Sequence, residues 1–368
     1  MKKPPAKVAV PVAVILLAST AFLVLRSLEP RYKKYTDSFF DTFDTVVTVV
    51  AYTKDKKEFD MYFQKIHSRF QELHRLYDIY NTYEGINNIK TINDNAGIKP
   101  VKVNKEIIDL ILFAKDWYKR TGGKTNIAMG SVLRIWHDYR ERGQDDPENA
   151  KLPPMEALLE AAKHTDIDKV IVDTENSTVY LADKEMSLDV GAVAKGYATE
   201  IVAREIAAAG LKSGMISSGG NIRTIGTPLD GRRERWSVGI HDPRKSIFSE
   251  EDSLLGIVYV GDGFSVATSG GYQRYYVVDN KVYHHLIDPK TLMPANYYLA
   301  VTVVAKDAGV ADFMSTTLFL LPYDRSRSLA GSLDGVEAAW VMPDGRVEVT
   351  DGMKALMGGH DALGTKQR

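Results

Sequence analysis

The chain of 368 residues contains no cysteine. This absence excludes a disulfide framework, a thiol nucleophile, a thiolate metal site and a lipid-modified N-terminal cysteine. A charge excess of one sign is also missing, because 47 Lys and Arg residues nearly balance 48 Asp and Glu residues. No block of basic residues interleaved with aromatic residues occurs. We therefore expect no nucleic-acid partner.

Common catalytic motifs are missing too. The sequence has no HExxH, no GxSxG and no GxxxxGK[ST] run, so the usual metalloprotease, esterase and P-loop interpretations have no support. It also has no internal repeat or low-complexity tract. A hydrophobic content of 44% is ample for a packed core in one large domain or two modest ones.

The first residues differ in kind from the rest. Three lysines (Lys2, Lys3 and Lys7) precede an uncharged apolar run from Val8 to Leu25, which Arg26 closes. This length is near the minimum for a spanning helix. The sequence thus predicts a cytoplasmic stretch at 1–7, a transmembrane anchor at 8–25, a linker at 26–38, an extracytoplasmic domain at 39–360 and a tail at 361–368.

A cleaved signal peptide is the alternative for this segment, with a cut near the stretch from Ala18 to Ala21. We favour the anchor, because the apolar run is longer than the usual signal core of ~7 to 15 residues. The protein is then expected at the cytoplasmic membrane of a bacterium, with its catalytic domain outside.

Hydrophobic periodicity predicts an α+β fold. The run Thr45 to Thr53 is typical of a buried strand. Apolar residues recur at helical spacing over 59–77 and 107–118, and the Asn- and Gly-rich segment between these helices is expected to form a long loop. Later, a helix is predicted over 155–164, a hairpin follows it, and another helix begins just after Gly196. Strands predominate from Met215 to Val304.

Two distant segments carry the most chemistry. In ADFMSTTLFLL, Asp312 and Thr316 are four residues apart, so they share one face of a helix. A carboxylate and a hydroxyl side by side suit a hard cation such as Mg²⁺. Alone, the pair is more often a helix start with a buried threonine.

The second segment, SLDVGAVAKGYA, runs from Ser187 to Ala198. A glycine turn followed by a helix leaves backbone NH groups free to face an anion, and Lys195 adds a point charge suited to phosphate. Asp189 could accept hydrogen bonds from a ring or a ribose. A structural turn with a solvated lysine is an equally good interpretation.

Three further runs combine small or polar residues at strand ends. SSGGN (217–221) and ATSGGYQR (267–274) would let a ligand approach the backbone closely. In YHHLIDP, alternation along a strand turns one of His284 and His285 inward. A histidine of near-neutral pKa is a candidate proton acceptor for a hydroxyl nucleophile, although a packed or surface histidine is the more frequent case.

Together these runs resemble the ApbE family of FAD:protein FMN transferases. SLDVGAVAKGYA, SSGGN, WSVGIHDP, VATSGGYQR, YHHLIDPKT and VADFMSTT occur in the order and approximate spacing of that family, from about Phe39 to Leu321. The resemblance implies an α+β fold with mixed sheets, flanking helices and FAD in a central cleft. It implies Mg²⁺-dependent cleavage of FAD, release of AMP, and attachment of FMN by a phosphoester bond to a threonine or serine of an extracytoplasmic redox protein.

The resemblance also implies roles for matching residues. Mg²⁺ would be held by Ala192 through its carbonyl and by the side chains of Asp312 and Thr316. His285 would be the base, Asp288 would orient either His285 or the ligand, and Lys195 would hold phosphate. FAD contacts are expected from Phe43, Tyr80, Ala128, Asp189, Lys195, Gly219, Gly220, Asn221, Thr268, Ser269, Gly270, His285 and Leu286.

Some positions depart from the family pattern. FDT stands where MGT is usual, Asn126 replaces an acid, Glu200 stands where Asp is common, and Leu292 replaces a glycine. Tyr80 could stack on the isoalloxazine ring or belong to the core. Two other functions remain open at this point: an FAD pyrophosphatase that releases FMN and AMP, and a non-catalytic FAD-binding protein.

Overall fold

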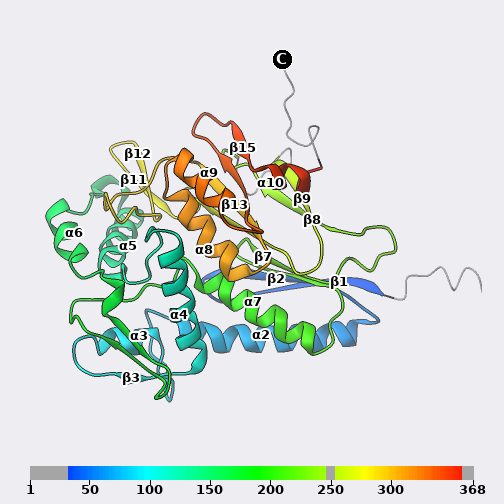
Figure 1. Cartoon of the computed structure of the whole chain (residues 1–368), viewed down its shortest axis with the longest axis horizontal. Coiled ribbons are helices and arrows are strands. Elements are labelled where there is room, and N and C mark those ends of the chain that lie inside the picture. The colour runs from blue at the N-terminus through cyan, green and yellow to red at the C-terminus, as the bar shows by residue number, and fades with distance from the viewer. Residues whose placement is uncertain (1–31, 246–252, 359–368) are drawn as a thin grey trace, which may run out of the picture.

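The computed structural model of the protein describes residues 32–245 and 253–358 (Figure 1). Within these ranges no helix is long and apolar enough to cross a membrane. The predicted cytoplasmic stretch 1–7, the anchor 8–25 and the tail 361–368 lie outside the described residues.

An eight-stranded antiparallel sheet forms the centre of the fold, in the order β1-β2-β6-β7-β10-β13-β14-β15. The strand predicted over Thr45 to Thr53 is confirmed as β2. The strands of this sheet are β1 (Lys33–Thr42), β2 (Thr45–Thr53), β6 (Gly214–Ser218), β7 (Asn221–Ile225), β10 (Ser265–Gly270), β13 (Ala300–Ala305), β14 (Glu337–Val341) and β15 (Val347–Val349).

Helices cover one face of this sheet. Alternate residues of β2 point to opposite faces, and Val47 and Val49 join the core on the helical side. In Figure 1, α2 and α7 lie side by side, with α8 crossing above them. The helices of this layer and of the adjoining lobe are α2 (Lys56–Tyr77), α3 (Ile89–Asp94), α4 (Lys105–Arg120), α7 (Ala194–Ala208), α8 (Ala308–Phe319) and α9 (Tyr323–Gly331).

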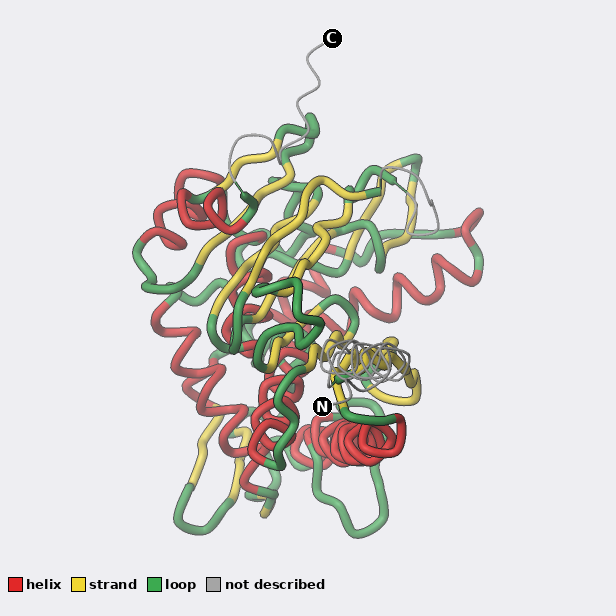
Figure 2. Tube along the Cα trace, turned by 90° about the vertical axis from the view of Figure 1, so that its right-hand side faces the viewer, coloured by secondary structure: helices red, strands yellow, loops and turns green. Residues whose placement is uncertain are grey.

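A smaller layer covers the other face. Val50 and Tyr52, which alternate with the residues above, pack there against Trp236 and Met353. The fold is thus layered, and Figure 2 shows the strands running together with helices beside them. This layer consists of β8 (Trp236–His241), β9 (Leu254–Val260) and α10 (Asp351–Leu356).

The remaining elements form a lobe beside the sheet. Trp136, Leu158, Tyr276 and Ile287 belong to a separate apolar cluster that joins the helices of this lobe to a two-stranded hairpin. The elements are α5 (Gly130–Asp145), α6 (Met155–Ala162), β3 (Val101–Lys102), β4 (Val170–Asp173), β5 (Thr178–Leu181), β11 (Tyr275–Val278) and β12 (Lys281–His284).

Three expectations from the sequence need correction. The predicted linker does not extend to residue 38, because residues 33–42 form the edge strand β1, whose mostly polar, exposed side chains give no apolar alternation. The predicted long loop contains α3, which a capping box at Asn88 starts. Helix α7 begins at Ala194 rather than after Gly196, so Lys195 and Gly196 lie in its first turn.

Candidate active site

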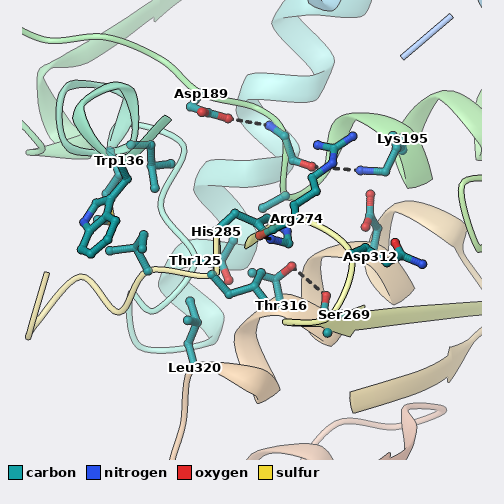
Figure 3. A pocket seen from close by; sticks show the side chains of 18 of the residues that line it. Thr125, Trp136, Asp189, Lys195, Ser269, Arg274, His285, Asp312, Thr316 and Leu320 are labelled. Atoms are coloured by element: carbon teal, nitrogen blue, oxygen red, sulfur yellow. Dashed lines mark hydrogen bonds between the residues drawn. The ribbon is translucent and has the colours of Figure 1, made fainter. Parts of the chain in front are cut away.

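A cleft opens where the first turn of α7, helix α8, the end of β10 and the segment after β12 meet. It contains about 1360 Å³ of empty space, its open mouth included. Figure 3 shows side chains from these elements pointing into it. The predicted site residues that line it are Tyr80, Asp189, Ala192, Lys195, Gly219, Asn221, Thr268, Ser269, Gly270, His285, Leu286, Asp312 and Thr316.

Asp312 is a buried carboxylate at the bottom of this cleft, with 6% of its surface exposed. Its Oδ2 accepts a hydrogen bond of 2.8 Å from the backbone NH of Gly196. Burial raises the pKa of Asp312, while the Lys195 charge and hydrogen bonds from Gly196 and Asn221 oppose that rise. A cation beside Asp312 would favour the ionised carboxylate further.

The same contact leaves the Ala192 carbonyl without a hydrogen-bond donor among the described residues. In an uninterrupted helix the NH of Gly196 would bond to this carbonyl four residues back, but here it donates to Asp312. The regular bonds resume one residue later, where Tyr197 NH donates to the Val193 carbonyl over 2.9 Å. Ala192 lines the cleft in the segment that packs against Asp312, and no described residue pairs with its carbonyl oxygen.

Thr316 supplies a third oxygen on the same wall. Its Oγ1 lies 3.2 Å from Oγ of Ser269, which also contacts Oγ of Ser315 at 2.8 Å. A carboxylate, a hydroxyl and a carbonyl suit a hard divalent cation that keeps water or ligand oxygens. The described residues contain no group of three His, Asp or Glu side chains able to hold a metal, so ligand oxygens would have to complete such a site.

Asp189 and Lys195 stand on either side of the turn that starts α7. Asp189 Oδ1 accepts a hydrogen bond of 2.8 Å from Gly191 NH, and burial raises the pKa of this carboxyl group. Lys195 Nζ reaches the Gly191 carbonyl at 3.4 Å. Both side chains face the cleft, as Figure 3 shows. The carboxyl group of Asp189 and the amine of Lys195 thus line the same cleft.

His285 follows β12 and turns toward the cleft, while His284 turns away and bonds to the Ala295 carbonyl. Burial and the nearby Arg274 charge lower the pKa of His285 to about 3. Its Nδ1 lies 3.3 Å from the Arg274 carbonyl oxygen. Because a carbonyl can only accept, Nδ1 carries the proton. Nε2 therefore keeps a free lone pair, as a general base requires.

Asp288 has different partners from those expected. Its carboxylate bonds to Lys124 Nζ at 2.8 and 3.0 Å and accepts from Lys290 NH at 2.8 Å. It is buried, and it is not among the residues that line the cleft. Lys124 does line the cleft. Among the described residues, Asp288 thus bonds to a lysine of the cleft lining and not to His285.

Three further predicted residues lie outside the cleft lining. Phe43 packs its ring against α2, with centroids 5.5 Å from His74 and 6.2 Å from Phe70. Ala128 is fully buried behind the wall, and Gly220 has open space around it. Thr45, Met129 and the predicted Gly219, which lie one or two positions away in the sequence, do line the cleft.

The sequence interpretation missed a cationic rim. Arg140 and Arg274 both line the cleft, and the guanidinium of Arg140 donates to His137 Nδ1 over 2.8 Å rather than to a carboxylate. Tyr80 is 53% exposed and lies 5.2 Å from the His137 ring, so it is no core residue. The run WHDYR could have indicated that Arg140 belongs to the site, because Trp136 and Arg140 are one helical turn apart and therefore share a face of the helix.

Comparisons with known proteins converge on one family. A sequence model of the ApbE family matches residues 43–340. A protein named FAD:protein FMN transferase from Treponema pallidum is 32% identical over 277 residues, which cover 72% of this chain and 73% of that protein. A protein of the same name from Klebsiella pneumoniae is 29% identical over 273 residues, or 74% of this chain and 80% of that one.

Solved structures show the same fold. The crystal structure of the ApbE protein from Thermotoga maritima aligns with a TM-score of 0.77 and 28% identity, covering 88% of this chain and 99% of that one. The apo flavinyl transferase ApbE from Pseudomonas stutzeri aligns with a TM-score of 0.73 at 22% identity, over 89% of this chain and 98% of that one. The predicted α+β fold of sheets flanked by helices is thus confirmed.

Proposed function

The chain belongs to the ApbE family, and from that premise we propose that it is an FAD:protein FMN transferase. It cleaves FAD, releases AMP and joins FMN through a phosphoester bond to a threonine or serine of another protein. The observation that carries the proposal is the meeting of Asp312, the free Ala192 carbonyl, Lys195 and His285 in one cleft.

The residues of the cleft would have different roles. Asp312, Thr316 and the Ala192 carbonyl would hold Mg²⁺, whose bound charge neutralises the pyrophosphate and stabilises the departing AMP. Lys195 offers a further positive charge to the phosphates. These oxygen atoms and this lysine come from the start of α7 and from α8, which packs against it, and this arrangement supports a binding site for a metal–pyrophosphate complex.

His285 suits the proton transfer. The acceptor hydroxyl oxygen forms a bond to the phosphorus of the FMN half, and the bond from that phosphorus to the bridging oxygen of AMP breaks. The hydroxyl proton goes to Nε2 of His285, whose ring is unprotonated in the ligand-free protein because burial and the Arg274 charge lower its pKa. The Nδ1–H bond to the Arg274 carbonyl fixes the ring and the tautomer.

One incubation separates the candidate functions. The full chain is mixed with FAD, Mg²⁺ and a folded acceptor protein that exposes a threonine, and then AMP, free FMN and flavin bound to protein are measured. Covalent flavin on the acceptor together with AMP supports the transferase. AMP with free FMN and no adduct would indicate a pyrophosphatase, and unchanged FAD would indicate a binding protein. An acceptor with threonine replaced by valine is the control.

The proposal also includes the location. The uncharged run 8–25, preceded by three lysines, supports a membrane anchor with the catalytic domain outside the cytoplasm. The acceptor would then be an extracytoplasmic redox protein. Protease added to spheroplasts should digest the domain of the full chain, and a domain that stays protected would contradict this location.

A further inference from the structure

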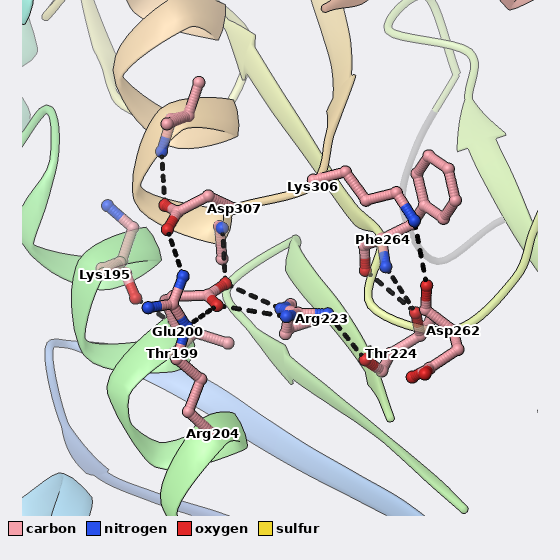
Figure 4. Close-up of polar contacts among 12 residues, drawn as sticks. Lys195, Thr199, Glu200, Arg204, Arg223, Thr224, Asp262, Phe264, Lys306 and Asp307 are labelled. Atoms are coloured by element: carbon pink, nitrogen blue, oxygen red, sulfur yellow. Dashed lines mark hydrogen bonds and ion pairs between the residues drawn. The ribbon is translucent and has the colours of Figure 1, made fainter. Parts of the chain in front are cut away.

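A second set of contacts lies directly behind the Gly196–Asp312 hydrogen bond. Glu200 Oε2 accepts a hydrogen bond of 2.8 Å from Ala308 NH, at the start of α8. The same oxygen accepts from Arg223 Nε over 2.7 Å. Figure 4 shows the side chain of Glu200 reaching from α7 toward Arg223 of β7, at the centre of these contacts. These are the same three elements that surround Asp312.

The contacts around Asp312, here called the front set, and the contacts around Glu200, here called the rear set, match in spacing. They are separated by one turn in α7, by one turn in α8 and by two residues in β7. These are the intervals at which side chains share a face of a helix or a strand. In the front set, β7 contributes Asn221, which bonds to Asp312. In the rear set it contributes Arg223, which bonds to Glu200.

The rear set is buried and charge-balanced. The side chain of Glu200 is 5% exposed and that of Arg223 is 11% exposed. Burial works against ionisation of Glu200, but hydrogen bonds from Arg223 and from Ala308 NH outweigh it and lower its pKa. Arg204 bonds to Glu200 and also to Asp307, which caps α8. Charge-assisted bonds of this kind fix geometry closely.

Helices α7 and α8 are in contact at Gly196, next to the Gly196–Asp312 hydrogen bond. A Cβ added at Gly196 would lie 2.2 Å from the Ala308 carbonyl oxygen and 2.4 Å from Asp312 Cβ. The two backbones are therefore in direct contact, with no side chain between them. A slide of α8 along α7 would break the Gly196–Asp312 bond and move the carboxylate away from the Ala192 carbonyl.

We propose that Glu200, held by Arg223, is a positioning residue for the cation site. By binding Ala308 NH it fixes α8 in register with α7, so that the Asp312 carboxylate and the Ala192 carbonyl face the same point. This inference rests on the proposed function for the presence of a metal, but it concerns residues that contact neither the metal nor FAD. Outer partners of this kind typically change metal affinity or activity by 10–100-fold.

The test measures Mn²⁺ binding to the full chain, by loss of the free Mn²⁺ signal in electron paramagnetic resonance. Glu200→Ala should raise the Mn²⁺ dissociation constant by roughly 10–100-fold and raise the Mg²⁺ concentration for half-maximal AMP release in parallel. Glu200→Gln keeps an oxygen that can accept from Ala308 NH, so it should recover most of the affinity. Arg223→Met should weaken Mn²⁺ binding in the same direction.

Glu205→Ala is the matched control, because Glu205 lies on the same helix but binds Arg69, away from α8. It should lower thermal stability and leave Mn²⁺ affinity unchanged. Equal Mn²⁺ affinity in the wild type and both Glu200 variants would overturn the inference, as would AMP release by a wild-type chain that takes up no Mn²⁺. If the wild type neither binds Mn²⁺ nor releases AMP, the proposed function itself fails.

Discussion

The backbone NH of Gly196 donates a hydrogen bond of 2.8 Å to Oδ2 of Asp312, a residue 116 positions further along the chain. This bond has two effects on the cleft. It gives a buried carboxylate a donor, and it withdraws the donor that a regular helix would supply to the Ala192 carbonyl. One contact between two helices thus arranges two oxygen atoms that a divalent cation would accept as ligands.

Replacing Gly196 by alanine should disturb this arrangement. The added Cβ would meet Ala308 O and Asp312 Cβ at 2.2 and 2.4 Å, and neither atom can rotate away. We expect Gly196→Ala to lower the free energy of unfolding by about 1–3 kcal/mol and to reduce AMP release at least roughly 10-fold. Thermal unfolding and chromatographic assay of AMP measure the two effects.

Gly331→Ala is the control for that substitution. Gly331 ends α9, is exposed, and would bring its Cβ within 4 Å of no heavy atom. Alanine has the higher helix propensity, so stability should hold and AMP release should not change. Full AMP release by Gly196→Ala would show that the close approach of the two helices is irrelevant to the reaction.

Removing the charge of Asp312 should abolish cleavage of FAD. Asp312→Asn keeps an oxygen that can accept from Gly196 NH, so the fold should survive, but it loses the charge that a cation requires. AMP release with Mg²⁺ should fall below detection, whereas FAD should still bind by flavin fluorescence. Asp116→Asn, on the exposed face of α4, should behave as wild type. Turnover by Asp312→Asn would show that the metal assignment is wrong.

The protonation state of His285 can be measured in a pH titration. Because burial and the Arg274 charge lower its pKa to about 3, the ring should remain neutral in the ligand-free protein from about pH 5 upward. Its NMR signals should then not titrate between about pH 5 and 8. A midpoint near the ordinary value of 6.5 would contradict the buried, cation-flanked environment.

The same shift links stability to pH. The folded-state pKa of His285 lies below the unfolded value of 6.5, so the unfolded chain binds the proton more tightly. The stabilising contribution is complete above pH 6.5 and is lost as the pH falls toward 3. His285→Gln should therefore lose less stability than wild type between pH 7 and about pH 5, as measured by urea unfolding. An identical loss in both proteins would rule out this linkage.

Tyr80 offers a test of flavin contact. Its ring is 53% exposed at the cleft, and aromatic pairs contribute about 0.5–1.5 kcal/mol. Tyr80→Leu should weaken FAD binding roughly 2- to 13-fold, while Tyr80→Phe should keep the affinity. Tyr275→Leu, at an exposed tyrosine outside the cleft lining, is the control. Equal affinities in all three variants would remove Tyr80 from the flavin site.

Much of the fold follows from apolar periodicity. The strand β2 has the predicted bounds, and α2, α4 and α8 occur where helical spacing or a helical motif places them. The edge strand β1 was not predicted, because only two of its ten residues, Phe39 and Thr42, are buried. Backbone pairing with β2 orders this strand, and such pairing leaves no apolar pattern in the sequence.

For the candidate site, the sequence determined which chemical groups are present. The segments around Asp189, Lys195, His285 and Asp312 were identified from residue type, spacing and family resemblance, and the structure brings all four into one cleft. Residue type and local spacing are properties of short stretches of chain, so they can be recognised before any long-range contact is known.

Only the tertiary structure decided how those groups are used. It pairs Asp288 with Lys124 instead of His285, adds Arg140 to the rim, and diverts Gly196 NH to Asp312. These contacts join elements far apart in the chain, and they depend on how closely the helices pack and which donor each buried acceptor finds. The sequence alone determined which chemical groups the site contains, whereas tertiary packing determined the hydrogen-bond partner of each group.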